Sequence, residues 1–82
     1  MVILWDEPKR LANLDKHGID FADIGFDFFL GAMVLPARLG RMMAIGRLAD
    51  GALAVVFVHL GEEAISIISA RPASQKEREF LP

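Results

Sequence analysis

Three polar residues near the N-terminus have the spacing of one helix face. Lys9, Asn13 and Lys16 stand at positions i, i+4 and i+7, so a helix places them together, while Leu11 and Leu14 project from the other side. The three residues form a polar stripe with two positive charges. The pattern is compatible with a functional site and also with a solvated helix face, and both interpretations stand at this point.

A pair of arginines near the C-terminus offers a second basic group. Arg71 ends a segment with strand-like alternation, and Arg78 lies one turn into a short helix expected after Ser74. Two guanidinium groups beside a helix N-terminus can hold phosphate through bidentate, charge-assisted hydrogen bonds. The alternative interpretation is that Arg71 pairs with a carboxylate such as Glu62 or Glu63.

Few side chains in the sequence can exchange protons near neutral pH. Glu77 can be interpreted as a general base, although its position three residues after Ser74 also fits the returning half of a capping box. Of the two imidazoles, His17 is the better chemical candidate, because His59 lies within a strand pattern and fits a half-buried sheet residue. The sequence has no cluster with metal-ligand spacing and no glycine-rich phosphate loop, so we expect neither a metal nor a cofactor.

The composition is typical of one small domain spanning residues 1–82. The chain has 82 residues, of which 54% are hydrophobic and 24% charged, and it has no cysteine. Its net charge of −2 argues against a general electrostatic grip on nucleic acid as the main function. The charge is uneven, with three basic and six acidic residues in 1–30 and six basic and five acidic residues in 31–82. A local basic site is therefore compatible with the negative total.

The hydrophobic excess either closes a thin core or covers the surface of a partner. The longest apolar stretch, residues 52–60, is far short of the roughly 20 residues that a membrane span requires. The N-terminal residues also lack the features of a secretory signal. We therefore expect a cytoplasmic protein that does not contact the membrane.

The first third of the chain predicts a short strand followed by two helices. Apolar residues at 2–5 indicate the strand, and a helix is expected over 8–17, with Gly18 as its left-handed C-cap. Asp20 is the expected N-cap of a second helix that ends near Gly31.

Beyond residue 31 the hydrophobic period changes to two, which predicts an antiparallel sheet. Three strands are expected, with a possible fourth at the edge, over 41–48, 53–60, 65–70 and 32–36. Turn signals at 50–51 and 60–61 separate them, and the alternation places Arg71 on the same face as Ile65 and Ile67. The predicted class is α+β, with two helices packed on a three- to four-stranded antiparallel sheet and a short C-terminal helix.

The order of motifs along the chain resembles that of a known family. In order, the motifs are Trp5-Asp6, Lys16-His17-Gly18, Arg41, Ala44-Ile45-Gly46, Ile67-Ile68-Ser69-Ala70-Arg71 and Glu77-Arg78. This set is similar to the BrnT toxins of type II toxin-antitoxin systems. The resemblance implies a RelE-like fold and a metal-independent ribonuclease activity that halts translation.

The resemblance also implies roles for particular residues. It points to a catalytic set of Lys16, His17, Arg41, Arg71, Glu77 and Arg78, with Lys9 and Asn13 as supporting RNA-binding positions on the first helix. We also expect Arg47 to bind RNA. An arginine stays charged and cannot be the base, so the proton-transfer group is Lys16, His17 or Glu77. The chain departs from the family pattern at Ser66, where many members have arginine, and at Phe80, where many have tyrosine.

The same resemblance implies the partners of the protein. They are an RNA substrate and a BrnA-type ribbon-helix-helix antitoxin, in a 2:2 heterotetramer that contacts operator DNA only through the antitoxin. The competing hypothesis is an antitoxin-binding module with weak or no catalysis of its own. Met42, Met43 and Phe80 would suit such an interface, although Met43 also fits a core position.

Overall fold

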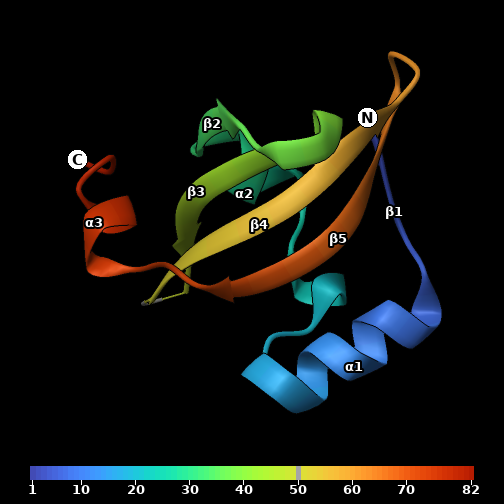
Figure 1. Ribbon diagram of the computed structural model, residues 1–82, viewed down its shortest axis with the longest axis horizontal. Coiled ribbons are helices and arrows are strands. Elements are labelled where there is room, and N and C mark those ends of the chain that lie inside the picture. Colours follow the sequence, from blue (N-terminus) through green and yellow to red (C-terminus); the bar gives the residue numbers. More distant parts are fainter. Residues whose placement is uncertain (50) are drawn as a thin grey trace.

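A twisted five-stranded sheet forms the centre of the structure (Figure 1). The computed structural model describes residues 1–49 and 51–82. The strands are β1 (Val2–Trp5), β2 (Met33–Pro36), β3 (Met42–Leu48), β4 (Gly51–Leu60) and β5 (Ala64–Pro72). The helices are α1 (Glu7–His17), α2 (Phe26–Leu30) and α3 (Gln75–Arg78), and two 3-10 turns are η1 (Phe21–Asp23) and η2 (Arg38–Gly40). The predicted α+β class is confirmed.

The sheet is mixed, which corrects the prediction of three or four antiparallel strands. Its order is β1-β5-β4-β3-β2, and β1 runs parallel to β5 while the other neighbours are antiparallel. The pairing of β1 with β5 joins the two ends of the chain, and such long-range pairing has no local signal in the sequence. Strand β4 is central, as its apolar pattern indicates, and β2 lies at the edge, where Pro36 is tolerated.

One of the two predicted turns between the last three strands lies within the described residues. Asp50 of the turn predicted at 50–51 lies outside the described residues. The turn predicted at 60–61 is present, and Gly61 has a φ of 68°, a left-handed conformation that glycine adopts without steric cost.

Helix α1 forms as predicted, but its orientation is not the one that the spacing suggests. Asp6 caps its N-terminus by accepting from the Lys9 N–H, and Gly18 ends it at a φ of 70°. Leu11 and Leu14 are 52% and 37% exposed, whereas Asn13 is the buried residue of the helix. The face that carries the polar stripe therefore lies toward the sheet.

The predicted second helix is interrupted. Asp20 does act as an N-cap by accepting from the Ala22 N–H at 2.9 Å, but the turn that it starts is η1, which ends at Asp23. Gly25 then adopts an extended conformation, with φ −102° and ψ −173°, before α2 begins at Phe26. No helix among the described residues is both long and apolar enough to cross a membrane.

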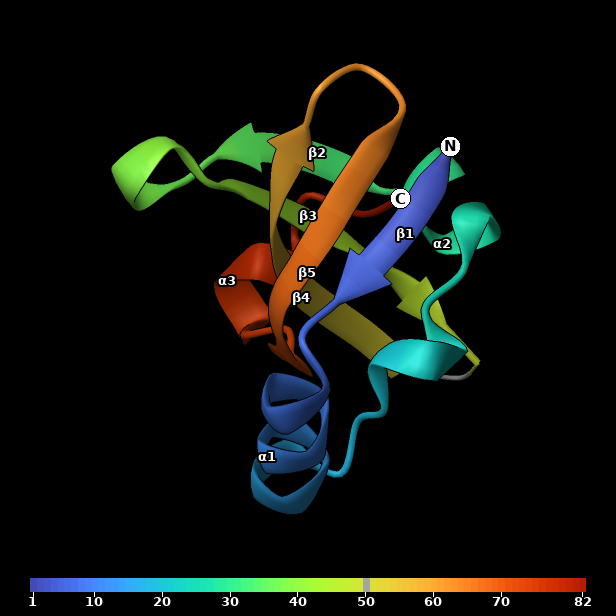
Figure 2. The ribbon, with the colours of Figure 1, turned by 90° about the vertical axis from the view of Figure 1, so that its right-hand side faces the viewer.

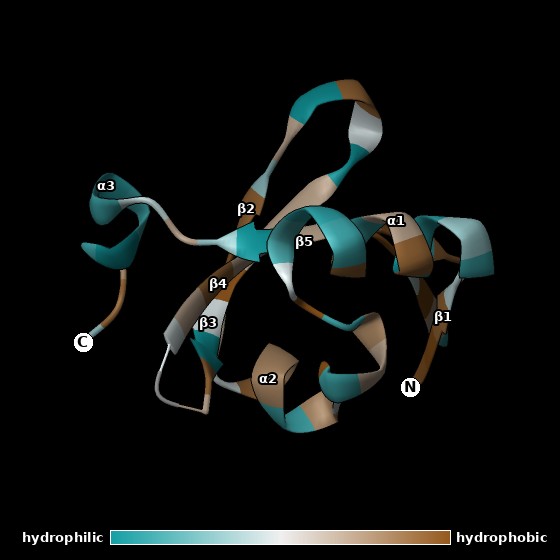
Figure 3. Ribbon diagram, turned by 90° about the horizontal axis from the view of Figure 1, so that it is seen from below, coloured by the Kyte–Doolittle hydropathy of each residue, from teal (hydrophilic) through white to brown (hydrophobic). Residues whose placement is uncertain are grey.

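The hydrophobic core lies on one side of the sheet, under η1 and α2. Figure 2 shows α2 on this side and α3 together with the β2–β3 loop on the other. The fully or nearly buried core side chains are Phe21, Ile24, Phe28, Ala44, Leu53, Val55, Phe57, Ile65, Ile67 and Ala70. Figure 3 shows the same asymmetry, because α2 has hydrophobic residues whereas α3 is coloured as hydrophilic.

His59 is exposed rather than half-buried as predicted, and its ring packs edge-on against Phe57.

A β-bulge in β5 reverses the predicted orientation of Arg71. Phe57 pairs with Ile67, but the preceding residue Val56 pairs with Ser69, so Ile68 is an extra residue in the strand. The alternation after Ile68 is therefore shifted by one position. Arg71 consequently lies on the face opposite to Ile67, which corrects the prediction that the two share a face.

Candidate functional site

The side of the sheet away from the core, here called the outer face, is crossed by a row of four paired residues. Leu35 pairs with Met43, Met43 with Val56, and Val56 with Ser69, which brings β2, β3, β4 and β5 into register. In the next row, Arg71 pairs with Ala54. Most of the predicted site residues are arranged around these two rows.

Arg71 is fixed on the outer face by a bidentate ion pair with Glu77. Its Nη1 and Nη2 atoms donate to Glu77 Oε1 and Oε2 at 2.7 and 2.8 Å. The alternative interpretation, that Arg71 pairs with a carboxylate, is therefore confirmed, but the partner is Glu77 rather than Glu62 or Glu63. Since Arg71 ends β5 and Glu77 lies on α3, the pair also joins the terminal helix to the sheet.

Glu77 performs the capping role as well. Its Oε1 accepts from the Ser74 N–H at 2.8 Å, and Ser74 Oγ accepts from the Glu77 N–H at 3.1 Å, which completes the predicted capping box. The Arg71 guanidinium lowers the pKa of Glu77 to about 2, and it outweighs the opposing effect of burial. Glu77 is thus ionised at neutral pH and is a weak base, because a general base works best with a pKa near the working pH.

A hollow between α1 and β5 collects the cations of the first helix. Lys9, Lys16 and His17 line it together with Ala12, Asn13, Ile68 and Ser69, and its volume is about 240 Å³. We call it the α1 hollow. Both lysines are exposed and His17 is half-buried. The prediction that Lys9 and Lys16 share one face is confirmed, and Ser69 is a polar residue of this hollow that the sequence analysis did not select.

Asn13 uses its amide to attach α1 to the edge of β5. Its Oδ1 accepts from the Ala70 N–H at 3.0 Å, and its Nδ2 donates to the Ile19 carbonyl at 3.1 Å. Pairing of β1 with β5 ends at Trp5 and Ile67, so Ala70 lies beyond the last strand neighbour on that side. Asn13 therefore satisfies a strand N–H that would otherwise be unpaired. The interpretation of Asn13 as part of a solvated face is wrong.

A second hollow lies beside the β2–β3 loop. Arg38 and Arg41 line it with Pro36, Ala37, Met43 and Val56, and its volume is about 290 Å³. We call it the loop hollow. Arg41 is among the predicted site residues, whereas Arg38 was missed because it follows Pro36 in a segment without a recognisable motif.

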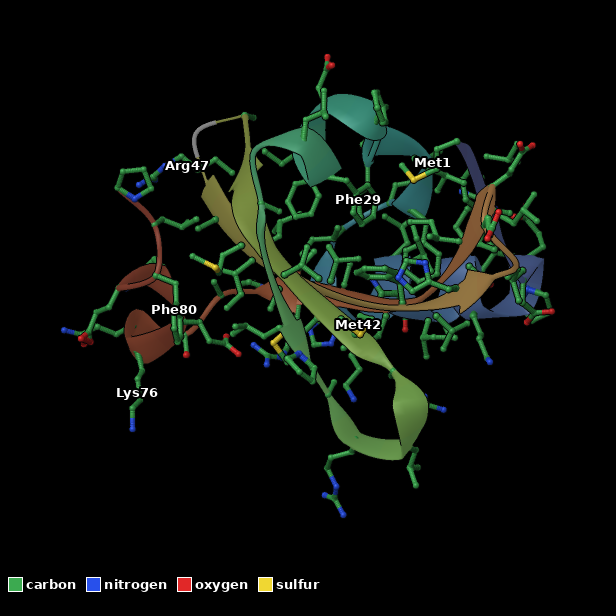
Figure 4. All side chains as sticks on the ribbon, turned by 90° about the horizontal axis from the view of Figure 1, so that it is seen from above. Met1, Phe29, Met42, Arg47, Lys76 and Phe80 are labelled. Atoms are coloured by element: carbon green, nitrogen blue, oxygen red, sulfur yellow. The ribbon has the colours of Figure 1, made fainter. Side chains whose placement is uncertain are left out.

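The two remaining basic residues of the predicted site lie further toward the C-terminus. Arg47 donates from Nη2 to the Pro82 carbonyl at 2.8 Å, and Figure 4 shows it beside the C-terminal segment. Arg78 is exposed at the end of α3. The structure therefore groups Lys16 with His17, and Arg71 with Glu77, and it places Arg41 and Arg47 at separate positions.

A larger apolar hollow of about 640 Å³ lies between α3 and the strands β2 and β3. Phe80 and Met43 are among its lining residues, and Phe80 is 47% exposed. Figure 4 shows Phe80 beside α3. Met42 instead packs against the core. The predicted core position of Met43 and the predicted surface position of Met42 are thus reversed, because β3 directs Met42 inward and Met43 toward the outer face.

Within residues 1–49 and 51–82, no group of three or more metal-ligating side chains is found.

The fold and this distribution of charge define a class of protein: a small α+β domain that presents lysines, arginines and a histidine around one sheet face, where an anionic ligand can be held. A family model narrows the class. The model described as the ribonuclease toxin BrnT of type II toxin-antitoxin systems matches residues 5–77, and the chain belongs to this family.

A solved structure agrees with this assignment. The crystal structure of the Brucella abortus ribonuclease toxin BrnT is 54% identical in sequence, covers 92% of this chain and 99% of its own, and superposes with a TM-score of 0.86. A search of curated proteins gives no match. The chain is therefore a ribonuclease toxin of a type II toxin-antitoxin system, and a toxin of this type has a cognate antitoxin.

Proposed function

We propose that this toxin cleaves RNA without a metal ion, on the part of the outer face that extends from the α1 hollow to Arg71. In this reaction a base removes the proton of the 2′-hydroxyl, whose oxygen attacks the adjacent phosphorus, and the 5′-oxygen leaves and takes up a proton from an acid. The products are a 2′,3′-cyclic phosphate and a 5′-hydroxyl. The observation that carries the proposal is the Arg71–Glu77 ion pair, which fixes a guanidinium two residues from Ser69 in the α1 hollow.

Arg71 is suited to stabilise the negative charge of the transition state. A guanidinium has five N–H donors, and Arg71 directs two of them to Glu77 and one to the Pro72 carbonyl. Two N–H groups therefore remain for phosphate oxygens. Because Glu77 holds the group rigidly, little reorganisation is needed when charge develops.

Proton transfer falls to the α1 hollow rather than to Glu77. Glu77 has a pKa of about 2 and already accepts bonds from Arg71 and Ser74, so it acts as a positioning residue. Imidazoles exchange protons near neutral pH, which makes His17 the first candidate and Lys16 the second. Lys9 and Lys16 contact RNA phosphates, while Asn13 fixes the position of the helix that carries them.

We assign the other basic residues to binding of the RNA substrate. Arg41 lies in the loop hollow, and Arg78 lies exposed on α3, where each can contact the RNA backbone. Arg47 remains a proposed RNA contact, although one of its donors is directed to Pro82.

The proposal extends to the biology of the toxin. We infer a RelE-like, cytoplasmic endoribonuclease that inhibits translation and is neutralised by a DNA-binding BrnA-type antitoxin in a 2:2 complex. Operator DNA is contacted through the antitoxin. The family membership supports these inferences, since a type II toxin implies a protein antitoxin.

The direct test is incubation of the purified protein with total RNA in EDTA, comparing the unmodified protein, Arg71→Ala and the control Lys76→Ala. We expect fragments with cyclic 3′ phosphates, a loss of about 100-fold or more in rate for Arg71→Ala, and an unchanged rate for Lys76→Ala. Lys76 is exposed on α3, so its substitution removes a charge from the same element without disturbing the ion pair. Full activity of Arg71→Ala would refute the proposed role of this arginine.

One observation favours the second candidate function, an antitoxin-binding module with weak catalysis. The apolar hollow lined by Phe80 lies beside Glu77 and presents a surface that a partner can cover. Harmless expression in cells together with tight antitoxin binding would support this function. Growth arrest that the antitoxin cures would support catalysis.

A further inference from the structure

The loop between β2 and β3 presents two arginines that pair with nothing in the described chain. Arg38 and Arg41 are exposed, and across residues 1–49 and 51–82 neither makes an ion pair or a side-chain hydrogen bond. The loop is nonetheless ordered, because the Ala37 N–H donates to the Arg41 carbonyl at 2.8 Å. Two unneutralised guanidiniums on one fixed loop are suited to hold phosphate groups.

The tip of this loop holds an apolar side chain in a strained conformation. Leu39 has φ 60° and ψ 38°, the left-handed region that costs energy for a leucine, and it is 89% exposed. Burial of the Leu39 side chain does not compensate for this cost, and the residue is not a glycine, which would adopt the conformation freely. Strained residues of this kind cluster at binding sites, and an exposed apolar side chain can pack on an unstacked base.

The loop hollow and the α1 hollow lie next to each other on the sheet, because a lining residue of one is paired with a lining residue of the other. Val56 lines the loop hollow, Ser69 lines the α1 hollow, and these two residues are direct partners in adjacent strands. Neighbouring strands are about 4.8 Å apart, so β5 and β3 are separated by about 10 Å. That distance corresponds to roughly three stacked nucleotides of a single strand.

We propose that the loop hollow is a second RNA-backbone site, in which Arg38 contacts a phosphate of the single strand whose cleaved bond lies near the α1 hollow. The inference rests on the proposed function for the place of cleavage, and it adds the path of the substrate and a binding residue, Arg38, outside the catalytic group. The occupant is a single strand rather than a duplex, because the hollow of about 290 Å³ is of the size of one nucleotide. RNA outside the cleavage site then contributes to affinity.

The test compares binding of a mixed-sequence nonanucleotide and a dinucleotide made of 2′-O-methyl RNA, which lacks the attacking hydroxyl and cannot be cleaved. Arg38→Ala should weaken binding of the nonanucleotide about 5- to 20-fold and that of the dinucleotide less than about 2-fold. The dependence of log affinity on log salt should become shallower by about 0.7, as expected for one lost phosphate contact on a single strand. Arg38→Lys should recover most of the affinity, and Lys76→Ala is the charge-matched control.

The outcomes separate this inference from the proposed function, because cleavage of unmodified RNA is measured in parallel. Equal binding by the unmodified protein and Arg38→Ala would overturn the second site, while continued RNA cleavage would leave the proposed function standing. Length-independent binding by the unmodified protein would also overturn it. A length-dependent loss in Arg38→Ala without any cleavage activity would support the RNA path and remove the proposed catalysis.

Discussion

At the scale of single residues, the Asn13 amide stabilises the fold, because it makes two hydrogen bonds to backbone groups. Asn13→Ala leaves the Ala70 N–H and the Ile19 carbonyl without partners, so we expect the free energy of unfolding to fall by about 2–3 kcal/mol. Urea denaturation measures this change. The control is Leu11→Ala on the same helix, which should change stability by less than about 0.5 kcal/mol because Leu11 is exposed.

This experiment also separates a structural role of Asn13 from direct RNA binding. If Asn13→Ala left stability unchanged but weakened RNA binding, the amide would be a substrate contact after all. A loss of stability with the affinity of the folded protein retained is the result expected from the geometry, since both ends of the amide are bound to backbone groups.

At the scale of elements, the local signals predicted the structure well and the non-local features escaped them. Asp6, Gly18 and the capping box at Ser74 are found where their types place them, because a cap depends only on its own few residues. The extra residue Ile68 in β5 has no such signature, since a bulge depends on how the partner strand is aligned. That one residue decides which face Arg71 occupies.

The site shows the same division between local and non-local features. The stripe of Lys9 and Lys16 follows from helix geometry, and the resemblance of the motifs pointed to Arg71 and Glu77. The bidentate bond between Arg71 and Glu77 could not be foreseen, because the turn after β5 sets it. Arg38 was missed because the loop hollow that it lines forms only when β2, β3 and β4 are in register.

The packing of α2 on β3 leads to a prediction about Gly46. A Cβ atom at this position would lie 3.0 Å from the ring of Phe28 and 3.2 Å from the Cβ of Ala32. Gly46→Ala should therefore lower the free energy of unfolding by about 1–3 kcal/mol through overpacking, as measured by urea denaturation. Gly25→Ala is the matched control, because a Cβ there meets nothing within 4 Å and its φ is −102°, so a decrease of similar size in Gly25→Ala would contradict the steric explanation.

At the scale of the whole molecule, the outer face is assembled from segments at both ends of the chain. Helix α1 contributes the lysines and His17, β5 contributes Arg71, and α3 contributes the carboxylate that fixes Arg71. The parallel pairing of β1 with β5 is what brings α1 beside the second half of β5.

Two charged clusters at separate places in the molecule make its stability depend on acid pH. The Arg10 guanidinium lowers the pKa of Glu7, and the Ala22 N–H together with Arg10 lowers the pKa of Asp20. At the junction of β5 with α3, Arg71 lowers the pKa of Glu77 to about 2. Because the folded state holds the Glu77 carboxyl below its ordinary pKa of 4.5, the contribution of Glu77 to stability is present above about pH 4.5 and is lost as the pH falls toward 2. Glu7 and Asp20 change stability in the same direction as the pH falls. Glu77→Gln should therefore have a lower urea midpoint than the unmodified protein at pH 7 and a smaller further decrease between pH 4.5 and 2. Glu79→Gln, at the exposed C-cap residue that follows α3, is the control. If Glu77→Gln lost as much stability as the unmodified protein over that acid range, the ion pair with Arg71 would not be the source of the dependence. Acid unfolding would then begin at the Arg10 cluster instead.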